Sequence, residues 1–112
     1  MDFKFLSLSN INSKITILIA KIVYINRIVI VNICFNSNNT FSNNEIFGII
    51  SYSSEKVSTT DGIYGIGGGS NNLIFGFTIH NEGDIRSGFY PNPIKATQYA
   101  NINSVYYTNK KL

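Results

Sequence analysis

The sequence has little charge and almost no cysteine. Charged residues make up 13% of the 112 residues, and the formal net charge is only +3. That share is about half of what a typical globular chain carries. The nine cations form no stripe, so a nucleic-acid partner is not expected. Cys34 is the single cysteine, which excludes a disulfide framework, and its apolar surroundings predict a buried, unreactive thiol.

Motifs for catalysis, metals or nucleotides are absent as well. Gly67 to Gly69 lack the following Lys and Ser or Thr of a phosphate loop, and they are expected to form a flexible turn up to Asn71. His80 has no recognisable nucleophile partner, and it is expected to be a solvated or capped residue at a strand end. We therefore expect no cofactor, no bound metal and no enzymatic activity.

An uncharged apolar run of membrane-spanning length is also missing. Residues 15–35 have about the right length, but they contain Lys21 and Arg27, each costing about 2.5–3.5 kcal/mol near the centre of a bilayer. Two strands explain the run better, so no membrane insertion is expected. The uninterrupted apolar core of this region is short and no small-residue cleavage site follows it, so no signal peptide is expected.

What the chain does have is the alternating pattern of β-strands, clearest in residues 72–90. Leu73, Phe75, Phe77 and Ile79 occupy every second position, as in a strand with one buried face. The turn that follows contains Asn, Gly and Asp and returns the chain into a second strand. Its residues, for which a structural role is expected, are Asn81, Glu82, Gly83 and Asp84.

Similar patterns predict about seven strands and no helix. The expected strands are 15–24, 28–35, 45–51, 63–66, 72–80, 85–90 and 99–108. Short strands at this spacing favour an antiparallel β-sandwich. We expect a lead-in arm over residues 1–14, the sandwich over 15–108 and a tail over 109–112.

Residues 15–35 are apolar on both faces of the expected strands. Such strands lie either inside a sandwich or against another subunit, and the sequence leaves both alternatives open. Asn26 and Arg27 lie between these two strands, and this short connection suits a tight hairpin. Asn suits the left-handed conformation of such a turn, whereas Arg27 replaces the usual Gly, so a longer loop or a bulge is the alternative.

The order of these elements resembles a known family. Residues 21–33 read KIVYINRIVIVNI, 47–50 read FGII, 63–67 read IYGIG, 77–85 read FTIHNEGDI and 102–107 read INSVYY. Over roughly residues 15–108 the chain resembles the C-terminal head or tip domain of tailed-bacteriophage or prophage tail fibres and baseplate receptor-binding proteins. The family's first hairpin commonly has Gly where this chain has Arg27.

The resemblance implies a jelly-roll-like β-sandwich that assembles as a homotrimer and adheres to a carbohydrate or protein on a host cell. It also implies a location in the virion tail, after synthesis in the bacterial cytoplasm without a signal peptide. The family has no fixed binding motif, so candidates come from residue chemistry. Tyr rings can stack on sugars and Asn amides can bond to hydroxyls. The candidate ligand-binding residues in or beside loops are Tyr52, Tyr64, Asn71, Asn72 and Tyr90.

Two other functions are compatible with the sequence. One is a purely structural virion or baseplate sandwich that binds no receptor. The other, less favoured, is a small tail-associated glycosidase, which needs two carboxylates about 5–9.5 Å apart. The acidic residues available for such a pair are Asp2, Glu45, Glu55, Asp61, Glu82 and Asp84, of which the last two belong to the turn.

Overall fold

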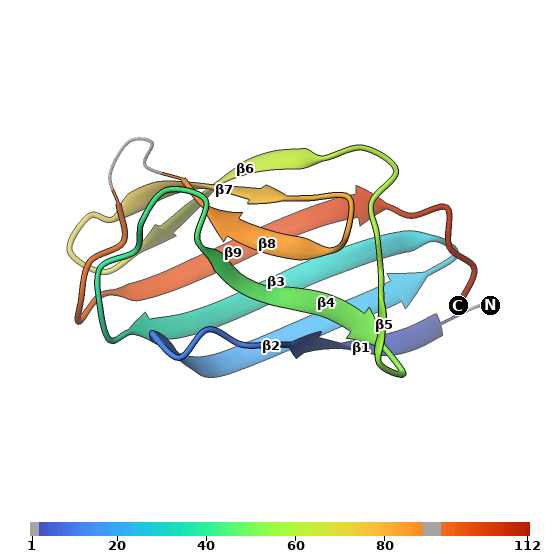
Figure 1. Ribbon diagram of the computed structural model, residues 1–112, viewed down its shortest axis with the longest axis horizontal. Helices are drawn as coiled ribbons and strands as arrows, with labels where there is room; N and C mark the ends of the chain where they lie inside the picture. The colour runs from blue at the N-terminus through green and yellow to red at the C-terminus, as the bar shows by residue number, and fades with distance from the viewer. Residues whose placement is uncertain (1–2, 89–92) are drawn as a thin grey trace.

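The computed structural model describes residues 3–88 and 93–112, and these contain strands and no helix (Figure 1). The all-β prediction is therefore confirmed. The strands are β1 (Phe3–Ser9), β2 (Ile15–Ile25), β3 (Ile28–Ser37), β4 (Ile46–Tyr52), β5 (Glu55–Lys56), β6 (Ile63–Gly69), β7 (Ile74–Ile79), β8 (Asp84–Ser87) and β9 (Tyr99–Tyr107).

The strands form one antiparallel sheet that closes on itself. Its order is β1-β2-β3-β9-β6-β7-β8-β4, and β1 also pairs with β4, so eight strands make a barrel to which β5 adds one short strand. The predicted jelly-roll-like β-sandwich is therefore wrong. Alternating side chains look the same in a sandwich and in a barrel, and only the pairing of the first strand with β4 distinguishes the two folds.

Strand β1 is the closing element, although residues 1–14 were expected to lead in as an arm. Phe3 to Leu6 pair with β2, and Ser7 to Ser9 pair with β4. Leu6 points into the core. The barrel therefore begins well before residue 15. The expected tail, residues 109–112, also contacts the barrel, because Leu112 packs against the core.

The β2–β3 hairpin has a two-residue turn. Asn26 and Arg27 both have positive φ values, 48° and 70°, and Ile25 pairs directly with Ile28. Positive φ at both central residues is the geometry of the tight hairpin turn that matches strand twist. Arg27 is therefore accommodated without a longer loop, and the irregularity in these strands lies instead between Ile17 and Ile19.

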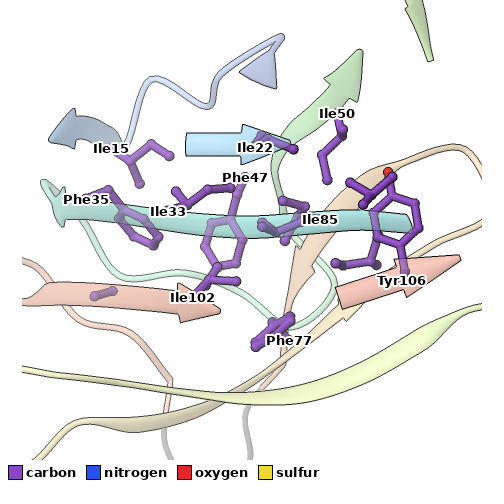
Figure 2. Packing of buried hydrophobic residues seen from close by; sticks show 14 of the residues in the cluster. Ile15, Ile22, Ile33, Phe35, Phe47, Ile50, Phe77, Ile85, Ile102 and Tyr106 are labelled. Atoms are coloured by element: carbon purple, nitrogen blue, oxygen red, sulfur yellow. The ribbon is translucent and has the colours of Figure 1, made fainter. Parts of the chain in front are cut away.

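Aromatic and branched aliphatic side chains fill the barrel (Figure 2). Phe35, Phe47 and Phe77, which come from three different strands, are almost completely buried together with Ile33 and Ile85. A filled interior provides a rigid scaffold but leaves no room for a ligand. Binding sites must therefore lie on the outside.

The three consecutive glycines lie in β6 and not in a turn. Gly67 stands beneath the ring of Phe75, and a Cβ there would overlap that ring and the backbone oxygen of Asn101. The turn itself comes later, at Asn71 and Asn72, whose φ values are 56° and 58°. The expectation that these glycines form the turn is therefore wrong. A strand against which aromatic rings pack closely also needs residues without a side chain, so glycines do not by themselves indicate a turn.

Candidate functional site

A hollow of about 370 Å³ lies on the outer surface of β6, β7 and β8, and we call it the β6–β8 hollow. It extends over the turn between β7 and β8. Its lining residues are Gly62, Ile63, Tyr64, Thr78, Ile79, His80, Asn81, Glu82, Asp84 and Arg86. The hollow thus joins one predicted ligand residue with three of the four turn residues for which a structural role was expected.

Strand register places three side chains of this hollow in one row. Tyr64 pairs with Thr78, and Thr78 pairs with Arg86. Directly opposed residues on neighbouring antiparallel strands have Cβ atoms about 4.5–5.5 Å apart, so the three side chains are close neighbours. Tyr64 is 62% exposed. The row therefore presents an accessible aromatic ring, a hydroxyl and a guanidinium side by side.

An ion pair fixes the guanidinium end of the row. Arg86 Nε donates to Asp84 Oδ2 at 2.6 Å, and the Asp84 side chain is only 7% exposed whereas that of Arg86 is 34% exposed. A buried carboxylate that is bound in this way orients the arginine. The Arg86 side chain thus remains partly exposed while its Nε is held by the buried carboxylate.

Thr78 adds a polar atom to the floor of the hollow. Its Oγ1 is buried and has no hydrogen-bond partner among the described residues. Native structures rarely leave a buried hydroxyl unsatisfied. Thr78 Oγ1 is therefore an unsatisfied polar atom beneath the surface of the hollow.

The turn beside the hollow is tightly held. The Gly83 N–H donates to His80 O and the His80 N–H donates to Asp84 O, both at 2.9 Å. Gly83 has a φ of +79°, and a Cβ there would lie 2.8 Å from the backbone oxygen of Val57. The glycine is required by both its conformation and this close approach. The turn is consequently a fixed wall of the hollow.

The other predicted ligand residues lie elsewhere. Asn71 and Asn72 line a second hollow of about 250 Å³ together with Pro93 and Lys95. Tyr64 is near the start of β6 and Asn71 follows its end, a separation of about 23 Å along an extended chain. The structure does not bring these amides to Tyr64.

Of the two remaining tyrosine candidates, only Tyr52 lies among the described residues, and it does not line either hollow. Tyr52 ends β4 and packs, half-buried, against the core. Tyr90 lies outside the described residues. Arg86 and Thr78 were missed because their place beside Tyr64 depends on strand register, which the sequence does not fix. The one signal in the sequence was the strand alternation, which places Thr78 on the opposite face of its strand from the buried Phe77.

A second surface, which we call the outer apolar face, covers the outside of β1, β2, β3 and β9. The register aligns its residues in two rows of four. All eight are apolar and exposed or half-buried. The first row is Phe5, Val23, Ile30 and Val105, and the second is Phe3, Ile25, Ile28 and Tyr107.

Neither metal ligation nor thiol chemistry is indicated in the part of the chain that the structure describes. No three His, Cys, Asp or Glu side chains there are grouped so as to hold a metal ion. Cys34 is buried, as predicted, and its Sγ lies 3.5 Å from Asn101 Oδ1. The two surfaces are thus the features from which a function can be argued.

Two comparisons with known proteins find no relative of this chain. A scan against protein-family models and a search of curated proteins both find no match to this chain. Within residues 3–88 and 93–112, no helix has the length and apolar character needed to cross a membrane.

Proposed function

We propose that this chain is a non-enzymatic adhesion module that binds a carbohydrate or protein on a host cell surface, as the head of a phage or prophage tail fibre or baseplate receptor-binding protein does. In this proposal it assembles as a homotrimer within the virion tail. The β6–β8 hollow is the observation that supports binding most directly. The correction from sandwich to barrel leaves this proposal open, because function resides in surface sites and many folds can carry one site.

The chemistry of the hollow suits a sugar ring. Tyr64 offers an exposed aromatic face to the C–H groups of a pyranose, while the partly exposed guanidinium of Arg86 lies in the same cross-strand row. Its volume of about 370 Å³ lies at the small end of the range of ligand pockets, roughly 300–1,000 Å³. One or two sugar units would therefore occupy it.

Charge in the hollow favours a neutral sugar. Glu82 and Asp84 are acidic and Arg86 is basic, so with His80 neutral the formal charge is −1. The nearest cation is already paired with Asp84 at 2.6 Å. Glu82 is paired with Lys56 at 3.7 Å. Both carboxylates of the hollow thus have a cationic partner, and Arg86 is not free to attract a sugar acid, whereas the hydroxyls of a neutral hexose can accept from arginine and donate to carboxylate oxygens.

The experiment is a glycan array followed by NMR titration of the best neutral glycan. Replacing Tyr64 by Ala should weaken binding about tenfold, because it removes the stacking surface, and Tyr64→Phe should change affinity less than about threefold. Tyr99→Ala, on the outside of β9, is the matched control and should bind normally. Equal affinities for the Tyr64→Ala variant and the wild type would exclude this site.

A structural role in the virion or baseplate, without a receptor, is the second candidate. The outer apolar face favours it, because a large exposed apolar surface marks a place where proteins assemble. An array that gives no binding to any glycan or host cell, from a protein that nevertheless assembles, would favour this role over adhesion.

A further inference from the structure

The outer apolar face is large for a surface in contact with water. Its three aromatic side chains, Phe3, Phe5 and Tyr107, are 41%, 68% and 50% exposed. Aromatic side chains of about 150–250 Å² each then leave roughly 240–400 Å² accessible, before the aliphatic residues are counted. The largest apolar patch of a typical monomer is about 300–600 Å². The three aromatic side chains alone therefore bring this face into the range of the largest apolar patch of a monomer, which is often a functional surface.

The arrangement of the face suits another β-sheet. Its eight side chains stand in two straight cross-strand rows, and Phe3 and Phe5 pack edge to face with ring centroids 5.0 Å apart. Sheets that pack face to face interdigitate such rows across a layer about 10 Å thick. Strand β3, in the middle of the face, is paired along both edges with β2 and β9, so it cannot associate with another chain by edge pairing.

The charges around the outer apolar face do not favour another protein over a further copy of this chain. None of its eight residues is charged, and the next row on β2, β3 and β9 is Lys21, Asn32 and Asn103. An uncharged patch is as complementary to itself as to another protein. In a pair of copies, Lys21 would stay at the solvated rim, and a net charge of +3 per chain produces only weak repulsion.

We infer that the outer apolar face is the surface through which the copies of the proposed trimer assemble, so that neighbouring copies of this chain cover it. Its three aromatic side chains alone supply roughly 240–400 Å² of the roughly 600–1,000 Å² that each partner contributes to a specific interface, and the five aliphatic residues add to this. This inference rests on the proposed assembly of several copies, but it does not depend on the proposed ligand.

The test is the molar mass in solution of the complete chain and of two charge variants. Ile30→Glu places a charge in the centre of the face, and Ile74→Glu places the same charge on β7, two strands away from β9, at a comparably exposed site. Light scattering and ultracentrifugation over about 1–100 µM would detect dissociation constants in that range. Circular dichroism would check that each variant keeps its strands.

The wild type and Ile74→Glu should assemble, and Ile30→Glu should be a monomer or have an apparent dissociation constant at least tenfold higher. If Ile30→Glu fails to fold, Phe5→Glu takes its place, because Phe5 is the most exposed residue of the face. A wild type that stays monomeric at about 100 µM would overturn both the assembly and this interface.

Other results separate the two proposals. If all three proteins assemble equally, copies meet through another surface, so the inference fails while the assembly stands. If a monomeric protein instead sediments with phosphatidylserine vesicles and Ile30→Glu abolishes this, the face binds lipid and the inference is overturned. Glycan binding by the monomeric Ile30→Glu variant, measured per site, should equal that of the wild type.

Discussion

At the scale of single residues, Glu45 connects segments that are distant in the chain. Its carboxylate accepts from Lys14 Nζ at 2.9 Å, from Asn12 Nδ2 at 3.1 Å and from the Ser42 N–H at 2.9 Å. Desolvation by itself raises the pKa of Glu45, but the bonds from Ser42, Lys14 and Asn12 outweigh it, so the pKa lies below its ordinary value of 4.5. The ionised form is therefore the one that the folded barrel stabilises.

This shift predicts how stability depends on pH. Because the folded-state pKa of Glu45 is lowered, its contribution is complete above about pH 4.5 and is lost as pH falls through the folded value. Glu45→Gln should cost about 1–2 kcal/mol at pH 7, since the bonds lose their charge. The difference from the wild type should shrink below about pH 4 in urea denaturation. A difference that stays constant from pH 7 to pH 3 would contradict this assignment.

At the scale of elements, the β6–β7 hairpin shows why glycine occurs within a strand. Gly65 and Gly67 on β6 stand opposite Phe77 and Phe75 on β7, whose rings cover the glycine positions. The same hairpin carries Tyr64 on its outer side. Close packing on one side of β6 thus supports the β6–β8 hollow on the other.

Substitution within this glycine run should distinguish packing from flexibility. Gly67→Ala should destabilise the barrel by about 1–3 kcal/mol, because the new methyl group overlaps the ring of Phe75 and the oxygen of Asn101. Gly68→Ala is the matched control. Its methyl group would come no closer than 3.8 Å to a neighbouring atom, so the change should stay within about 0.5 kcal/mol. Equal losses in chemical denaturation would mean that backbone freedom, and not packing, is what this segment needs.

At the scale of the whole molecule, closure of the sheet is the feature with the widest consequences. Strand β1 completes it, since its first half pairs with β2 and its second half with β4. Without β1, both of these strands would have an unpaired edge, and the core beneath Leu6 would be open to water. The outer apolar face would also lose Phe3 and Phe5.

Removal of residues 1–9 tests closure directly. The shortened chain should lose several kcal/mol of stability, enough to lower the melting temperature by more than about 10 °C. Hydrogen exchange should show lost protection at Ile49 to Ser51, which pair with β1. If residues 1–9 were only an arm outside the fold, the melting temperature would stay within about 2 °C of the full chain's.

Side-chain alternation predicted seven of the nine strands and most of their inward faces, and it missed β1 and the short β5. Leu73, Phe75, Phe77 and Ile79 are all buried, as their alternation predicts, and the hairpin turn lies at Asn26 and Arg27. These are local properties, because a side chain's direction in a strand depends on its position relative to its neighbours.

The choice between a sandwich and a barrel depends on long-range strand pairing, and so does the set of apolar side chains that remains outside. Closure depends on a register between segments about 40 residues apart, such as Ser9 and Ile49. The hollow likewise depends on the register that aligns Tyr64, Thr78 and Arg86. Alternation repeats every two residues, so it is compatible with many pairings, and the pairing is chosen by the packing of the complete core.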